Sequence, residues 1–257
     1  MNCRRLELGL GLVSIGRKWG VRDVAPPSEG QARELLSTAL ELGIRTFDTA
    51  PAYAASEAIL GRFLGDLPAE QRAGLTIMTK AGEHWDAESG GTVVDHNYDA
   101  LRRSIDRSLE LLGPIAVLQI HKATEDVVGN ADVRRAIDYA RNAGILQFGA
   151  SISTVEAGRR AIETEIYSCL QFPLNESDWT FLSLLPDMAA SNIRPVINRP
   201  FAMGALVQSH EGQDLGKAAF AFLKHHVGDG IVLTGTGKPT HLRENVASFN
   251  AAVSAQV

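Results

Sequence analysis

The sequence predicts an α/β fold, the (β/α)8 TIM barrel, in which eight parallel strands alternate with eight helices. Short apolar runs alternate with longer segments of helical period from one end of the 257-residue chain to the other. That length is typical of such a barrel. An open doubly wound sheet is the alternative, but no G-x-G-x-x-G motif follows the first strand and no Pro/Gly/Ser-rich linker divides the chain. We therefore expect residues 1–257 to form one barrel domain.

The expected strands are short apolar runs of the length and composition that buried parallel strands have. In chain order they span residues 8–13, 45–49, 75–80, 116–121, 146–152, 167–172, 194–200 and 230–235.

The expected helices repeat apolar residues every three or four positions. Ser28 and Gln31 predict a capping box at the start of the first helix, and Ser56 is the expected N-cap of the second. Pro186 interrupts the sixth, and Pro239 lies in the first turn of the last. The helices are expected over residues 28–43, 56–64, 98–113, 132–144, 154–165, 181–192, 215–226 and 238–252.

Composition and charge are typical of a folded globular protein. Apolar residues make up 45% of the chain, and the net charge of −5 argues against a nucleic acid partner. Cys3 and Cys169 are far apart and without metal-ligand spacing, so a reducing compartment, the cytoplasm, is expected, with neither a disulfide framework nor a metal site. We also expect no membrane segment, because no apolar run approaches the length of a span.

Ionisable side chains stand at the ends of three successive predicted strands. Asp48 ends the second strand, Lys80 the third and His121 the fourth, and Tyr53 lies in the loop after the second. In a barrel these strand ends converge on one mouth, and neighbouring strands lie roughly 5 Å apart. We therefore expect the four side chains to form one cluster.

Such a cluster is suited to proton transfer. A free phenol has a pKa of about 10, and a nearby ammonium lowers this value because it stabilises the phenolate. Lys80 is placed to tune Tyr53 in this way, and Asp48 supplies the opposite charge that keeps a buried lysine protonated. His121 is then available to hydrogen-bond a substrate oxygen. We expect Tyr53 to act as a general acid or base.

These residues resemble the signature of the aldo-keto reductase family. The match rests on "FDTAPAY" with "SEAILG", on "TK" and on "QIH", and it extends over nearly the whole chain. The resemblance implies that Asp48, Tyr53, Lys80 and His121 are the family's catalytic tetrad. It also implies hydride transfer between NAD(P)H and a small-molecule carbonyl or alcohol substrate.

The second half of the chain is expected to bind the nicotinamide cofactor. "GTGK", residues 235–238, lies between the last strand and its helix, where backbone N–H groups can receive phosphate. Lys238, His241 and Arg243, in this turn and the helix after it, could pair with a 2′-phosphate and favour NADP(H), with NAD(H) the alternative. By residue type and by family resemblance, the expected cofactor-binding residues are Ser151, Gln171, Asn198, Arg199, Pro200, Phe201, Gly204, Leu206, Gly235, Thr236, Gly237, Lys238, His241, Glu244 and Asn245.

Some positions depart from the family pattern. Ile152 replaces a common Asn, and Asn198 stands where an aromatic residue usually stacks on the nicotinamide. The chain is also short after its last helix, which implies an open substrate pocket. His84 and Trp85 are expected to line the substrate pocket, and so is Trp179. For each of them the alternative is a position in an exposed loop.

Two other functions remain open on the sequence. One is a barrel lyase or aldolase in which Lys80 forms a Schiff base, which the charge of Asp48 opposes. The other is a non-catalytic subunit that binds NADP without turnover. The sequence does not indicate the substrate, the reaction direction or the oligomeric state.

Overall fold

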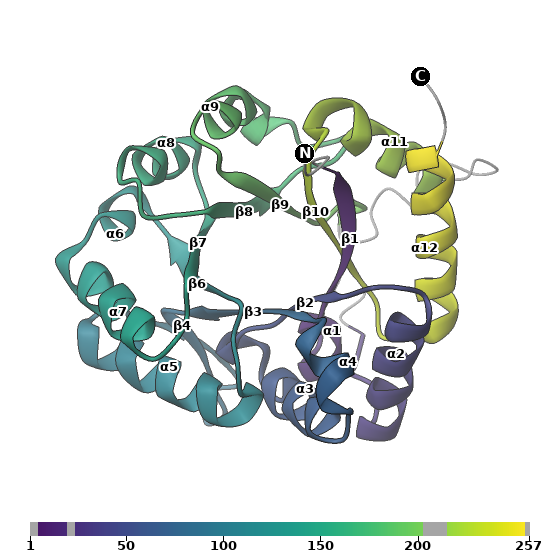
Figure 1. Cartoon of the computed structure of the whole chain (residues 1–257), viewed down its shortest axis with the longest axis horizontal. Helices are drawn as coiled ribbons and strands as arrows, with labels where there is room; N and C mark the ends of the chain where they lie inside the picture. The colour runs from purple at the N-terminus through teal and green to yellow at the C-terminus, as the bar shows by residue number, and fades with distance from the viewer. Residues whose placement is uncertain (1–4, 20–23, 203–214, 255–257) are drawn as a thin grey trace.

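Eight parallel strands form a closed barrel, and the helices make a ring around it (Figure 1). The computed structural model describes residues 5–19, 24–202 and 215–254. Each predicted strand is present and the predicted fold class is confirmed. In their order around the barrel, the strands are β1 (Leu6–Gly11), β2 (Thr46–Asp48), β3 (Thr76–Ala81), β6 (Val117–Ala123), β7 (Gln147–Ile152), β8 (Cys169–Pro173), β9 (Arg194–Asn198) and β10 (Gly230–Gly235).

The barrel closes between its first and last strands. β10 pairs with β1 in parallel over its whole length, from Leu6 opposite Gly230 to Gly11 opposite Gly235. β1 also pairs with β2, with Gly11 opposite Asp48. The end of β1 therefore lies between the end of β10 and the end of β2. The end of β10 was expected to bind the cofactor, and the end of β2 carries Asp48.

The helices lie on the outside of the barrel, and each of the eight predicted segments is helical (Figure 1). The sixth divides into a 3-10 helix and an α-helix, with Pro186 in the first turn of the second piece. Short additional helices were not predicted. Within the described residues the helices are α1 (Val13–Gly16), α2 (Glu29–Glu41), η1 (Pro51–Tyr53), α3 (Ser56–Gly65), α4 (Ala69–Ala73), α5 (Tyr98–Leu112), α6 (Glu125–Val128), α7 (Ala131–Asn142), α8 (Val155–Glu163), η2 (Thr180–Leu184), α9 (Leu185–Ala190), α11 (Leu215–Val227) and α12 (Pro239–Ser254).

The two predicted helix caps have different outcomes. Ser28 and Gln31 form the predicted capping box at the start of α2. The cap expected from Ser56 is wrong, because α3 begins at this residue without a side-chain cap. The Ser56 hydroxyl is instead buried, 2.8 Å from the Thr49 hydroxyl, and donates to the carbonyl oxygen of Leu12 at 3.1 Å. It therefore links the chain segments that follow β1 and β2.

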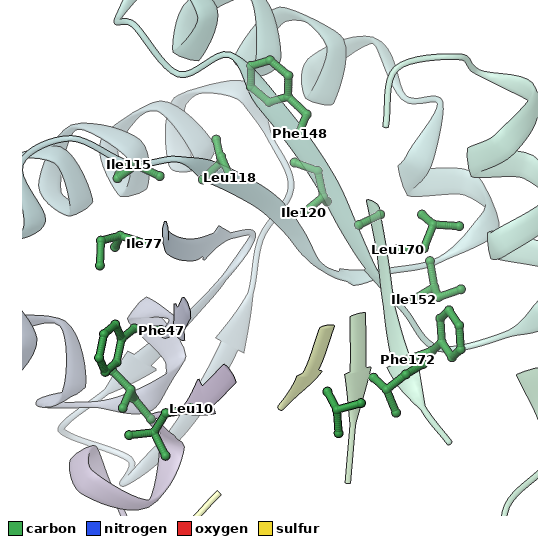
Figure 2. Close-up of a cluster of buried hydrophobic side chains, with 14 of the residues drawn as sticks. Leu10, Phe47, Ile77, Ile115, Leu118, Ile120, Phe148, Ile152, Leu170 and Phe172 are labelled. Carbon is green, nitrogen blue, oxygen red and sulfur yellow. The ribbon is translucent and has the colours of Figure 1, made fainter. Parts of the chain in front are cut away.

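The hydrophobic core lies mainly between the strands and the helices. It contains the outward-facing residues of the strands and the inward-facing residues of the helices. Figure 2 shows part of this layer, with Phe47, Ile77, Leu118, Phe148 and Phe172 on the outer side of the strands. Because alternate residues of a strand face opposite ways, the intervening residues point into the barrel.

The barrel interior changes from apolar to polar along its axis. A buried layer consists of Met78, Val117, Cys169, Val196, Ile231 and Leu233. Two residues further along three of these strands, the inward positions carry Lys80, Gln119 and Gln171, all buried. The buried polar residues Lys80, Gln119 and Gln171 therefore lie on the side of the apolar layer at which the strands terminate.

A β-hairpin that the sequence did not predict follows β3. It consists of β4 (Glu83–Asp86) paired in antiparallel fashion with β5 (Gly91–Val94). Gly82 joins β3 to the hairpin with φ of +109°, and a Cβ atom there would lie 2.5 Å from the His96 ring, so only glycine fits. None of the helices in the described ranges is long and apolar enough to cross a membrane.

Candidate active site

A pocket of about 1150 Å³ opens at the C-terminal ends of the barrel strands. Three of the four expected catalytic residues line it, while Lys80 lies buried behind them. Gly204 and Leu206 fall outside the described residues. All the other expected cofactor-binding residues line the pocket: Ser151, Gln171, Asn198, Arg199, Pro200, Phe201, Gly235, Thr236, Gly237, Lys238, His241, Glu244 and Asn245.

The four expected catalytic residues form a single cluster. Lys80 Nζ donates to Asp48 Oδ2 at 2.6 Å, and the two side chains are 1% and 3% exposed. The same ammonium lies 4.9 Å from the centroid of the Tyr53 ring. The Tyr53 and His121 rings pack edge to face with centroids 5.9 Å apart. β2, η1, β3 and β6 each contribute one side chain, as strand ends that meet at one mouth should.

The cluster keeps both Lys80 and Tyr53 protonated at neutral pH. Burial alone would lower the pKa of Lys80, but Asp48 and Tyr53 outweigh it, so this pKa lies above its usual value. Burial also raises the pKa of Tyr53; Lys80 lowers it, as predicted, but only in part. The predicted lowering of the Tyr53 pKa by Lys80 is present, but the effect of burial on this pKa is larger.

Glu83 is a polar partner of the cluster that the sequence analysis missed. It is the first residue of β4, and its Oε2 lies 3.0 Å from Nδ1 of His121. Burial opposes the charged form of Glu83, but His121 and the Thr92 hydroxyl, which donates at 2.8 Å, hold its pKa at about 2. Burial, with a contribution from Lys80, lowers the pKa of His121. At neutral pH we therefore expect an ionised Glu83 beside a neutral imidazole.

Two buried glutamines complete the support of Asp48. Gln119 donates to Asp48 Oδ1 at 3.0 Å and Gln171 donates to Asp48 Oδ2 at 3.3 Å. The carbonyl oxygens of both amides are buried without a hydrogen-bond partner. Buried polar atoms are rarely left unpaired, so Gln171 Oε1, which faces the pocket, marks a position where a ligand donor fits.

Other polar atoms of the pocket fit a nicotinamide dinucleotide. Asn198 Oδ1 and Ser14 Oγ are buried without partners, as Gln171 Oε1 is, and these oxygens can accept from a carboxamide or from ribose hydroxyls. The segment after β10 is ordered by its own contacts: Asn245 donates to the Thr234 hydroxyl at 2.7 Å, and the Lys238 amide donates to the Thr236 hydroxyl at 3.1 Å. The residues present therefore fit the group that the resemblance implies.

The expected substrate residues do not line the pocket. His84 is exposed on the hairpin and Trp85 is half-buried, so neither reaches the cavity. Trp179 is 53% exposed and packs against Phe222 and His226 of α11. None of the three side chains is among the residues that line the cavity, so the alternative, a position outside the pocket, fits the described structure better. The described part of the chain contains no group of three His, Cys, Asp or Glu residues that could hold a metal ion.

Comparisons with known proteins agree with this geometry. The model of the aldo/keto reductase family matches residues 7–214. A Pseudomonas aeruginosa protein assigned to the aldo-keto reductases has a solved structure with a TM-score of 0.81, 30% identity, and coverage of 96% of this chain and 90% of its own. The pyridoxal 4-dehydrogenase of Microbacterium luteolum is 25% identical over 96% of this chain and 90% of its own length. An uncharacterized oxidoreductase of Bacillus subtilis is 25% identical over 95% and 87%.

Proposed function

The chain belongs to the aldo/keto reductase family and is an NAD(P)-dependent oxidoreductase, and from this premise we propose that Tyr53 transfers the proton between a small-molecule carbonyl compound and its alcohol. The observation that carries the proposal is the buried Lys80–Asp48 pair, 2.6 Å apart, beside the Tyr53 ring. A buried cation next to a phenol stabilises the phenolate that remains once the proton has left.

In the reducing direction Tyr53 is the acid. Its raised pKa means that the phenol carries its proton at neutral pH and can donate it to the substrate oxygen. Lys80 stabilises the resulting phenolate, which regains a proton from solvent. His121 lies against the Tyr53 ring and orients the substrate oxygen, while Glu83 fixes the imidazole. In the oxidising direction the same phenolate accepts the alcohol proton.

The cofactor supplies the redox chemistry, because a bound reduced nicotinamide provides the hydride that adds to the carbonyl carbon. We assign its carboxamide to Ser151, Gln171 and Asn198. We assign its phosphates to the segment 198–201 and to the backbone of residues 235–238 at the start of α12.

The charge state of Lys80 argues against the Schiff-base alternative. A lysine nucleophile must lose its proton, whereas Asp48 and Tyr53 raise the pKa of Lys80 above its usual value. Lys80 also lies outside the pocket lining. The non-catalytic alternative is opposed by the complete cluster, since binding alone requires no buried acid–base group.

We further propose a preference for NADP(H). Lys238 and His241 line the pocket beside the Thr236 hydroxyl, and this set of donors suits a 2′-phosphate. Arg243 was also expected to contact the 2′-phosphate, but its Nη2 lies 3.6 Å from Glu41 Oε2 and the residue does not line the pocket. Lys238→Ala should therefore weaken NADPH binding more than NADH binding, and Arg243→Ala should change neither. Tighter NADH binding by the wild type would contradict the preference.

The proton-transfer role is tested with Tyr53→Phe. We expect turnover to fall about 10²- to 10⁴-fold while cofactor affinity, measured by fluorescence quenching, stays nearly constant. Tyr139→Phe is the matched control, because the Tyr139 hydroxyl pairs with Asp106 outside the pocket. Turnover of Tyr53→Phe within a few-fold of the wild type would remove Tyr53 from this role. A wild type that binds NADPH and reduces no aldehyde, ketone or sugar would favour the non-catalytic alternative.

A further inference from the structure

Four side chains alternate between arginine and tryptophan beside the pocket. The guanidinium of Arg17 lies 5.5 Å from the Trp19 ring centroid and 5.6 Å from that of Trp85. The guanidinium of Arg199 lies 5.9 Å from Trp19. Arg17 follows α1, Trp85 belongs to β4 and Arg199 follows β9, so three separate segments build the stack. Two indoles hold Arg17 by cation–π contacts, which fix the plane of its guanidinium.

Arg17 faces the pocket without a carboxylate partner. Arg17, Trp19 and Arg199 all line the cavity. Across the described ranges, no carboxylate forms an ion pair with the guanidinium of Arg17 or Arg199, and Arg17 Nε is buried without a hydrogen-bond acceptor. Buried donors are normally paired, so this orphan donor points to an acceptor that the protein itself does not supply.

The position of Arg17 ties it to the reacting end of the pocket. Gly16, the preceding residue, packs so closely on η1 that a Cβ atom would lie 1.8 Å from the carbonyl oxygen of Tyr53. Trp85, which stacks on Arg17, comes two residues after Glu83, the partner of His121. Arg17 is therefore held between the segments that position Tyr53 and His121. Arg199, the other arginine beside Trp19, belongs to the segment assigned to the cofactor.

We propose that Arg17 binds an anionic group of the carbonyl substrate, a carboxylate or a phosphate monoester. A guanidinium presents parallel donors that match both anions in bidentate fashion. Glu83, two residues before Trp85, lies 3.0 Å from His121 Nδ1 and accepts from the Thr92 hydroxyl, and it forms no ion pair with Arg17. The inference rests on the proposed function and narrows its substrates to carbonyl compounds that carry a negative charge.

The test compares substrates that differ only in the anion. The first pair is pentanal and 5-oxopentanoate, and the second is glyceraldehyde and glyceraldehyde 3-phosphate. For each pair, kcat/KM is measured at saturating NADPH in the wild type, Arg17→Gln and Arg17→Lys. We expect the wild type to prefer the charged member of at least one pair, so that the ratio of its kcat/KM to that of the neutral member is above one. Arg17→Gln should lower that ratio by about 10- to 100-fold, the range of a hydrogen bond to a charged group, and Arg17→Lys should lower it less. Arg33→Gln, which alters an exposed arginine paired with Asp66, is the control with an unchanged ratio.

A second measurement does not depend on turnover. Calorimetric titration of glutarate and of glycerol 3-phosphate into the NADP-loaded protein should show binding that Arg17→Gln weakens, whereas NADPH affinity stays unchanged. The substrate pair whose kcat/KM ratio falls in Arg17→Gln identifies the bound anion as a carboxylate or a phosphate. An unchanged ratio for both pairs, or weaker NADPH binding with unchanged anion binding, would overturn the inference. Anion binding that depends on Arg17 in a protein without turnover would support the inference while refuting the proposed catalysis.

Discussion

Replacing one member of the buried Lys80–Asp48 pair should lower the free energy of unfolding far more than replacing both members. In Asp48→Asn, the Lys80 ammonium keeps only the Thr49 carbonyl oxygen, 3.0 Å away, and the neighbouring phenol. At 2.6 Å and an effective dielectric constant of about 20, the lost Coulomb attraction is about 6 kcal/mol before desolvation is subtracted. Measured losses for such half-broken pairs are about 3 to 5 kcal/mol. We therefore expect Tm to fall by about 6 to 20 °C.

A double-mutant cycle separates the charge effect from packing. Lys80→Met leaves the Asp48 carboxylate without its cationic partner and should be similarly destabilising. Asp48→Asn/Lys80→Met removes both charges of the pair and should cost at least about 2 kcal/mol less than the two single changes together. The assay is reversible urea unfolding followed by circular dichroism at pH 7. Glu29→Gln, which breaks the exposed pair with Arg62, should leave the transition unchanged. Additive single effects would refute the reasoning.

The pH dependence of this cycle has a defined sign. In the wild type the raised pKa of Lys80 stabilises the fold at all pH values below its usual 10.5, and this contribution is lost only as the pH rises through the higher folded value. In Asp48→Asn, burial is no longer opposed by a carboxylate and lowers the pKa of Lys80. The unfolded chain then binds the extra proton, so the deficit of the variant should shrink as the pH rises toward 10.5.

Three further perturbations probe the surroundings of the cluster. The pKa of Glu83, about 2 against a usual 4.5, means that its stabilisation is present above pH 4.5 and lost as the pH falls toward 2; urea unfolding of Glu83→Gln should lack this decline. The same change should shift the acid limb of the pH–rate profile that reports His121 to lower pH. Gly16→Ala should displace Tyr53 and lower kcat at least 10-fold with little change in NADPH affinity, and an unchanged kcat would contradict the close contact. Burial raises the pKa of Cys169 to about 12, so mass spectrometry should find this thiol unmodified by iodoacetamide at pH 8 until the protein is unfolded.

The cluster could be predicted from the sequence because its members are fixed by the barrel itself. Asp48, Lys80 and His121 each lie on a barrel strand with its side chain facing inward, and strand register brings such positions together in any barrel of this kind. Strand register likewise places Ser151 opposite Gln171, near the ends of β7 and β8.

Residues placed by loops could not be predicted in this way. Glu83 meets His121 only because Gly82 adopts a positive φ and turns the chain into a hairpin, and the run "GEHWD" contains no periodic signal for that turn. Arg17 depends on the same hairpin, since Trp85 forms one side of its stack. Ser56 was misjudged because a serine before an apolar run is usually a cap, whereas a buried acceptor, the Leu12 carbonyl oxygen, claims its hydroxyl here.

Closure of the barrel by its first and last strands has a consequence for biosynthesis. A ribosome completes β1 by residue 11, but the partner on one side, β10, begins only at residue 230. At about 5 to 20 residues per second, β1 remains an edge strand for at least about ten seconds of synthesis, with unpaired backbone groups that can recruit another chain. The cluster of Asp48, Tyr53, Lys80 and His121 is translated long before residues 235–238, which we proposed as a phosphate-binding segment. A nascent chain therefore carries the residues proposed to transfer the proton well before the segment proposed to hold the cofactor phosphates, and throughout that interval one edge of β1 is unpaired.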